Sequence, residues 1–346
     1  MKRKIITTFG ILAITISFGN LLIGWVDKPS TTDPVVVKQA AAKSLLLLQK
    51  SGYVFVNNNE RKCASCHHNT LTAMAAELAR QKGVPLTDSL AASNVKAMET
   101  VIADACNPNQ INRFISGANF IIPYVLLGMS AEKYAPSLHT DIAVDYIMSQ
   151  AKPDGSFLTE SGRIPLETGV IHLTALAIRS IQLYASPAKK QQVDDLVKRT
   201  KQWLEKQVPN QQQELAFQLA GLQWCGSSTD LKAKVFEKLK SMQNKDGGWS
   251  QLPTLKSDAY ATGQTLFAMY ESGMAKPEDE VYQKGVEYLL KTQTGEGAWV
   301  VKTRSFPIQP YIETDFPPYD YNQFISATAS NWATIALLNT LPDKKN

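Results

Sequence analysis

Two cysteines and a histidine stand together in the string Cys63-Ala-Ser-Cys66-His67. Two thiols at this spacing can add across the vinyl groups of a porphyrin, and the adjacent imidazole can then bind the iron at an axial site. On a helix, positions i, i+3 and i+4 share one face, so the three side chains would point the same way. The string therefore predicts one covalently bound haem c, with Cys63 and Cys66 as attachment points and His67 as the axial iron ligand.

Three other interpretations of the same string remain open. Cys63 and Cys66 could form a disulfide or redox pair, or they could be structural thiols. They could also join His67 or His68 in a zinc site, although zinc needs a four-ligand set and the fourth ligand would come from a distant residue.

Other residues are candidates for completing a haem site. His172 lies in an apolar helical stretch and could serve as the distal iron ligand, although a hydrogen-bonded core histidine is the alternative. Arg163 could contact a haem propionate, because its guanidinium fork pairs with carboxylates. Glu167, Asp258 and Tyr260 could line the mouth of a cavity, but an Asp at a helix start more ordinarily caps the helix. The catalytic residues stay unknown.

The composition indicates a folded protein that does not bind nucleic acid. Of the 346 residues, 44% are hydrophobic and 19% are charged, which suffices for a sizeable core. The formal net charge is +5, and Lys2, Arg3 and Lys4 contribute three of these charges. No run of basic residues interleaved with aromatic residues follows, so the electrostatic pattern of a nucleic-acid-binding surface is missing.

Residues 1–26 are typical of an export signal. A basic start precedes a mostly apolar stretch over residues 5–26, which could be a removed signal peptide or an N-terminal membrane anchor. Both alternatives place the body of the protein outside the cytoplasm, in the periplasm or an equivalent compartment, and the second would associate it with a membrane. Export would permit a disulfide between Cys106 and Cys225, whereas free buried thiols are the alternative.

One pattern recurs along the chain: an apolar helix ends in Gln, and a turn with Gly then leads to an aromatic residue. Three copies are plain, at Gln150–Phe157, Gln243–Trp249 and Gln293–Trp299. Their spacing predicts a degenerate copy over 193–222, and a weaker first copy runs from Leu45 to Phe55. A second helical segment rich in small residues follows each plain turn.

These units are therefore helical hairpins that must stack on their neighbours to bury their apolar faces. We expect about six hairpins, beginning near residues 36, 91, 139, 190, 230 and 279. They would form one domain over 36–342 that includes the haem segment 63–68, after a linker at 27–35 and before a polar tail at 343–346. The proline-rich segment 306–320 departs from the repeat and should cover the cavity as a lid or close the ring as a clamp.

The Gln-x-x-x-Gly-x-Trp turns at 243–249 and 293–299 resemble the signature of the squalene-cyclase and protein-prenyltransferase repeat superfamily. The resemblance implies an all-α fold, an α/α toroid with one ring of helices inside another around an apolar central cavity. The Asp-x-Asp-Asp acid of the cyclases is missing. So is the Asp, Cys and His zinc set of the prenyltransferases, because Asp258 has no Cys two residues later and no His follows His172.

The chain also resembles an uncharacterised bacterial subgroup that joins such repeats to a Cys-x-Ser-Cys-His-His segment. The matching segments are 63–69, 163–167, 257–263 and 309–311. We therefore expect an exported haem c protein with a redox role, either in electron transfer to a partner protein or in oxidation of a small apolar, isoprenoid-like ligand in the cavity. The alternatives are a non-haem terpenoid-binding or cyclase-like enzyme with a structural Cys-x-x-Cys-His, and a toroid that serves as an interaction scaffold.

Overall fold

The computed structural model describes residues 32–60, 62, 64–106, 117–158, 163–307 and 311–344. The expected export segment 1–26, most of the expected linker, and Cys63 lie outside these residues. Within the described ranges every regular element is a helix. Two isolated β-bridges also occur in these ranges. None of the helices in this part of the chain is both long and apolar enough to cross a membrane.

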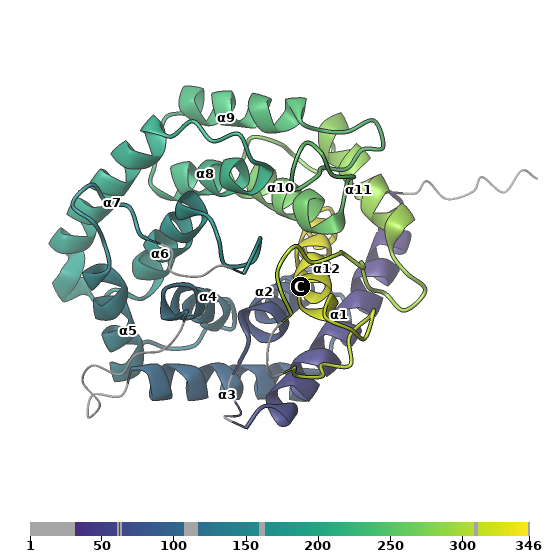
Figure 1. The fold of residues 1–346 in the computed structure, drawn as a ribbon, viewed down its shortest axis with the longest axis horizontal. Helices are drawn as coiled ribbons and strands as arrows, with labels where there is room; N and C mark the ends of the chain where they lie inside the picture. The colour runs from purple at the N-terminus through teal and green to yellow at the C-terminus, as the bar shows by residue number, and fades with distance from the viewer. Residues whose placement is uncertain are drawn as a thin grey trace, which may run out of the picture.

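Two concentric rings of helices make up the protein (Figure 1). The outer ring consists of α1 (Pro34–Asn58), α3 (Asp88–Ala105), α5 (Leu138–Ser149), α7 (Lys190–Lys206), α9 (Thr229–Ser241) and α11 (Glu280–Thr292). The inner ring consists of α2 (Leu71–Gln81), α4 (Ala118–Ala131), α6 (Val170–Tyr184), α8 (Gln212–Trp224), α10 (Ala259–Glu271) and α12 (Gln323–Leu338). Outer and inner helices alternate along the described chain, so the predicted α/α toroid of six helical hairpins is confirmed.

The two rings differ in how the sequence buries them. Outer helices such as α7 bury one stripe at helical spacing, formed by Val193, Leu196, Thr200 and Leu204. Inner helices are covered on every side, and all 16 residues of α12 are buried. A helix with apolar or small residues on every face must lie inside the protein. This explains why the segments rich in small residues form the inner ring.

The glutamine of the repeat turn joins neighbouring outer helices. The Gln243 side-chain amide donates 2.9 Å hydrogen bonds to the Gly247 carbonyl in its own turn and to the Val281 carbonyl at the start of α11. Gln293 repeats this arrangement and donates to the Ala40 carbonyl of α1 at 3.0 Å. The last turn therefore links α11 to α1 and closes the ring.

The aromatic residue of each plain turn is tied to the inner helix that follows. Its backbone N–H donates to a hydroxyl of that helix in three equivalent pairs: Phe157 to Thr174, Trp249 to Thr262, and Trp299 to Ser330. These serines and threonines are thus part of the repeat, although the Gln-Gly-Trp pattern did not include them.

One repeat turn differs from the other two in its contacts, and the expected first copy was wrong. Gln150 is exposed and bonds Ser149, and the link to the next outer helix is made instead by the Thr200 hydroxyl, which donates to the Gly155 carbonyl at 2.7 Å. The weaker first copy, residues 45–55, contains no turn because it lies inside α1. Gln49 nevertheless exchanges two hydrogen bonds with the Thr87 backbone before α3.

The described part of the proline-rich segment packs across α1 and α12. Ser51 donates to the Thr314 carbonyl, Asn58 donates to the Glu313 carbonyl, and Gln323 donates to the Ile312 carbonyl. Phe316 is fully buried beside these helices. The contacts fit a clamp that closes the ring.

Candidate functional site

A single π-helical turn, η1 (Cys66–Thr70), leads into α2 and carries Cys66 and His67 of the haem string. Ser65 caps it by accepting a hydrogen bond from the His67 backbone N–H at 3.0 Å, and the Asn331 amide donates to the His67 carbonyl at 2.9 Å. Ala64 and Ser65 before the turn are not helical. The expectation that one helix face presents all three residues was therefore wrong, since regular winding starts only at Cys66.

Two glycines let neighbouring helices approach this turn closely. A Cβ atom on Gly52 of α1 would lie 2.6 Å from the His68 carbonyl oxygen, and one on Gly128 of α4 would lie 2.9 Å from the Thr70 carbonyl oxygen. Both distances are shorter than real Cβ contacts. The turn is thus held between α1 and α4 at positions where a side chain would not fit.

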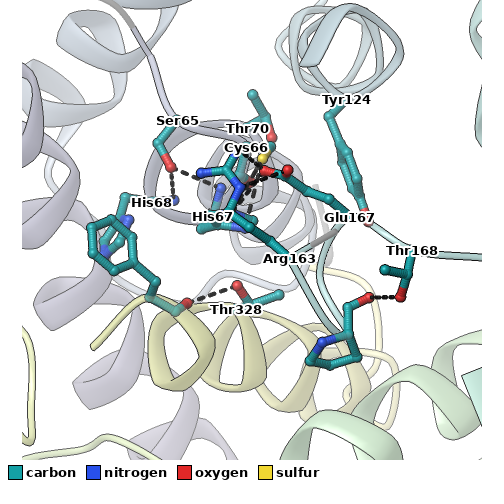
Figure 2. Close-up of polar contacts among 12 residues, drawn as sticks. Ser65, Cys66, His67, His68, Thr70, Tyr124, Arg163, Glu167, Thr168 and Thr328 are labelled. Carbon is teal, nitrogen blue, oxygen red and sulfur yellow. Dashed lines mark hydrogen bonds and ion pairs between the residues drawn. The ribbon is translucent and has the colours of Figure 1, made fainter. Parts of the chain in front are cut away.

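The turn places Cys66 and His67 against Glu167, which comes from the loop before α6 (Figure 2). The Cys66 Sγ atom lies 3.5 Å from His67 Nε2, and His67 Nε2 lies 3.9 Å from Glu167 Oε1. All three side chains are buried, and their candidate ligand atoms lie within 4.8 Å of one another. We call these three residues the buried cluster.

Arg163 holds the carboxylate of the buried cluster. Its Nε donates to Glu167 Oε2 at 2.7 Å, and its Nη2 pairs with the other carboxylate oxygen. The Glu167 backbone N–H also donates to the Arg163 carbonyl at 2.9 Å. The structure therefore brings together Cys66, His67, Arg163 and Glu167, all of which were candidates from the sequence.

Burial controls the protonation of the buried cluster. It raises the pKa of the Cys66 thiol to about 12, and the Glu167 charge adds to this effect. Burial also lowers the pKa of His67 well below its ordinary value, with the Arg163 charge contributing. Without a bound cation, the thiol and the imidazole are both neutral at pH 7.

His68 points to a different environment from His67. Its ring stacks on Phe55 at a centroid distance of 5.5 Å and meets Phe316 and Phe324 edge-on. Burial lowers the pKa of His68 to about 3, and neither ring nitrogen has a hydrogen-bond partner among the described residues.

His172 does not join the buried cluster. Its Nδ1 lies 3.2 Å from the Thr168 carbonyl oxygen and its Nε2 lies 2.9 Å from the Tyr124 hydroxyl, while the ring packs on Phe217 at a centroid distance of 4.0 Å. Burial lowers the pKa of His172 to about 3, so the imidazole is neutral. The contacts satisfy both ring nitrogens with protein groups.

Asp258 and Tyr260 lie at the start of α10, beside a second cavity. The Asp258 carboxylate caps the helix by accepting from the Ala261 N–H at 2.9 Å, as the capping alternative predicted. Tyr260 and Arg304 line the second cavity, which has a volume of about 260 Å³. The Tyr260 hydroxyl donates to Gln213 Oε1 at 2.7 Å.

The capping carboxylate should make stability depend on pH. Burial raises the pKa of Asp258 to about 6. Since the folded pKa exceeds the unfolded one, this stabilising contribution is present below about pH 4 and is lost as pH rises through 6. Asp258→Asn keeps a good capping residue that does not titrate. As pH rises from 4 to 7.5, the wild type should therefore lose about 2–3 kcal/mol of unfolding free energy that the variant keeps. Urea unfolding of both proteins across this pH range measures the difference in their unfolding free energies. A difference that does not change with pH would contradict the prediction.

A larger central cavity lies between the C-terminal halves of the inner helices. Its volume is about 630 Å³, and its walls combine charged side chains with a set of aromatic and aliphatic ones that includes Leu78, Leu127, Leu176, Phe217, Phe267 and Trp332. Tyr124 also lines this cavity, and Figure 2 shows its side chain beside Glu167. The buried cluster and the central cavity are thus neighbours separated by Tyr124.

The described side chains do not present the arrangement that a c-type haem requires. Thioether sulfurs lie at the rim of the porphyrin, whereas the axial imidazole nitrogen lies below its centre. Here Cys66 Sγ and His67 Nε2 converge to 3.5 Å, and Glu167 Oε1 lies 3.9 Å from that nitrogen. Neither cavity described above is lined by Cys66 or His67. Cys63 lies outside the described residues, so haem attachment stays a prediction.

Cys106 and Cys225 are buried and unpaired. The structure therefore favours free thiols at these positions.

The contact between Glu167 and His67 could not be predicted from the sequence. Glu167 was a candidate for the cavity mouth, and nothing in the neighbouring sequence indicated contact with His67. The four-residue spacing of Arg163 and Glu167 was the local signal for their ion pair.

Comparisons with known proteins support the fold. No protein-family model matches the sequence, and no curated protein matches it. The type II terpene cyclase MstE from Scytonema is similar in structure, with a TM-score of 0.56 and 13% identity over 88% of this chain and 99% of that one. MstE in complex with geranylgeranyl dihydroxybenzoate has a TM-score of 0.53 and 14% identity over 87% of this chain and 98% of that one.

A glycosidase in complex with glucose is also similar in structure, with a TM-score of 0.52 and 8% identity over 89% of this chain and 98% of that one. The TM-scores show a shared toroid fold, and the variety of ligands among these proteins shows that the fold alone does not select a substrate.

Proposed function

We propose that this protein binds a small apolar, isoprenoid-like ligand in its central cavity. The cavity itself carries the proposal: about 630 Å³ is the volume of a typical small-molecule site, and aromatic and aliphatic side chains form one part of its wall while charged side chains form another. Phe217 and Trp332 are almost fully buried at its inner end, where polar ligands would lose hydration without compensation. The likeness to a terpene cyclase that holds a geranylgeranyl substrate supports a ligand of this class.

The polar groups of the cavity favour binding over cyclisation by protonation. Glu77, Glu271 and Asp343 are the acids that line it, and they belong to the second half of α2, the end of α10 and the C-terminal segment. Glu77 pairs with Lys133 and Asp343 pairs with Lys82, while Glu271 accepts from Trp224. Tyr124 and Trp332 also line the cavity, and the Tyr124 hydroxyl and the buried Trp332 indole N–H are both too weak as acids to protonate an alkene.

A binding assay tests the proposal by comparing the wild type with a variant whose central cavity is filled by a larger side chain. Titration of the full chain with geranylgeraniol, followed by quenching of tryptophan fluorescence, should show saturable binding. Leu176→Trp should weaken binding at least about tenfold, because the indole would occupy the cavity that Leu176 lines.

Leu255→Trp is the matched control, since Leu255 is exposed on the surface and does not line this cavity. It should bind like the wild type. Absence of saturable binding to the wild type, or equal binding by both tryptophan variants, would refute the proposed function.

A further inference from the structure

We infer that Cys66, His67 and Glu167 together hold one divalent transition-metal ion, with Zn²⁺ as the best chemical match. The three donors come from two segments 101 positions apart in the sequence and converge on one point inside the protein. This metal centre does not depend on the ligand of the central cavity, so either proposal can fail without the other.

The donor types select the class of ion. A thiolate, an imidazole and a carboxylate suit zinc and its neighbours in the first transition series. Calcium and magnesium prefer oxygen donors, and the buried cluster offers them one oxygen-bearing side chain.

The distances also fit a small ion. With Zn–S near 2.3 Å and Zn–N or Zn–O near 2.1 Å, tetrahedral ligand atoms stand roughly 3.4–3.6 Å apart. Cys66 Sγ and His67 Nε2 are 3.5 Å apart, and His67 Nε2 and Glu167 Oε1 are 3.9 Å apart. All three candidate donor atoms lie within 4.8 Å of one another, so the ion would draw the Glu167 carboxylate closer to the other two ligands.

Surrounding residues already orient these ligands. Arg163 holds the Glu167 carboxylate through two contacts, while Ser65 and Asn331 hold the backbone of His67. Hydrogen bonds of this kind fix the ligands of metal sites and raise their affinity. In addition, the ion would deprotonate the Cys66 thiol and so supply its own thiolate ligand.

Three protein ligands leave one tetrahedral position for water or for a donor atom of a ligand. Tyr124 lies next to Glu167 and also lines the central cavity. A water molecule at the open position would be polarised by the ion.

Metal analysis of the purified full chain tests the site. We expect roughly one Zn²⁺ per chain by mass spectrometry, and a thiolate-to-cobalt charge-transfer band after exchange with Co²⁺. Cys66→Ser should lose the band, and Glu167→Gln should reduce metal retention at least tenfold. Cys225→Ser is the matched control, because Cys225 is also buried and unpaired but lies at the end of α8. It should keep both the metal and the band.

Folding of each variant is checked by far-ultraviolet circular dichroism. If Cys66→Ser does not fold, the cobalt spectrum of the wild type still tests whether the protein binds a metal ion through a thiolate. A folded wild type that binds neither Zn²⁺ nor Co²⁺, or a charge-transfer band that survives in folded Cys66→Ser, would overturn the inference. A Soret band that persists after acid-acetone extraction of protein made with a haem-maturation system would overturn it as well.

Discussion

Trp249→Ala is expected to lower the free energy of unfolding by about 3–5 kcal/mol. Trp249 is fully buried, its indole N–H donates to the Leu239 carbonyl at 2.7 Å, and its backbone N–H donates to Thr262. Alanine would leave a cavity between α9, α10 and α11 and would leave the Leu239 carbonyl without its side-chain partner. The loss is measured by urea unfolding followed by circular dichroism.

Two further variants separate the contributions at this turn. Trp249→Phe keeps most of the packing and removes the hydrogen bond, so it should cost about 1–2 kcal/mol. Trp203→Ala is a control on the outer helix α7, where the indole is only partly buried, and its cost should be clearly smaller than that of Trp249→Ala. Equal losses for the two alanine variants would show that the turn tryptophan has no special role in joining the rings.

Gly52→Val should destabilise the protein by about 3 kcal/mol and also disturb the buried cluster. A Cβ at this position would lie 2.6 Å from the backbone oxygen of His68 and 3.0 Å from the Asn69 side chain. The backbone oxygen cannot move away without shifting η1, and η1 carries Cys66 and His67. We therefore expect unfolding at lower urea together with a loss of bound metal in the folded protein.

Gly295→Val is the matched control for this substitution. A Cβ on Gly295 would meet nothing within 4 Å, so its effect should stay within about 0.5 kcal/mol, with metal retained. Retention of wild-type stability and metal content by Gly52→Val would mean that α1 and η1 can separate, and that the close approach is not needed for the site.

The helical hairpins were readable from the sequence because their signals are local. Each Gln, Gly and aromatic residue of a plain turn lies within eight residues, and the aromatic residue is bonded to the next helix along the chain. Even the degenerate unit was recognisable, since α7 and α8 occupy 190–206 and 212–224. Gln150 shows the limit of such reading: it matches the pattern, yet Thr200 makes the corresponding contact to the next helix.

The sequence by itself determined the helical hairpin repeat, because that repeat follows from apolar periodicity and from residues close together in the chain, and the toroid followed from the resemblance of the repeat turns to the squalene-cyclase and protein-prenyltransferase superfamily. The string with Cys66 and His67 also singled out those two residues as candidates for a site. Only the tertiary structure decided what faces those two side chains. Glu167 reaches His67 because ring closure brings the loop before α6 beside the turn before α2, and Tyr124 separates both from the central cavity. Contacts of this kind join segments about a hundred residues apart and leave no periodic trace, so their geometry becomes visible only once the rings are packed.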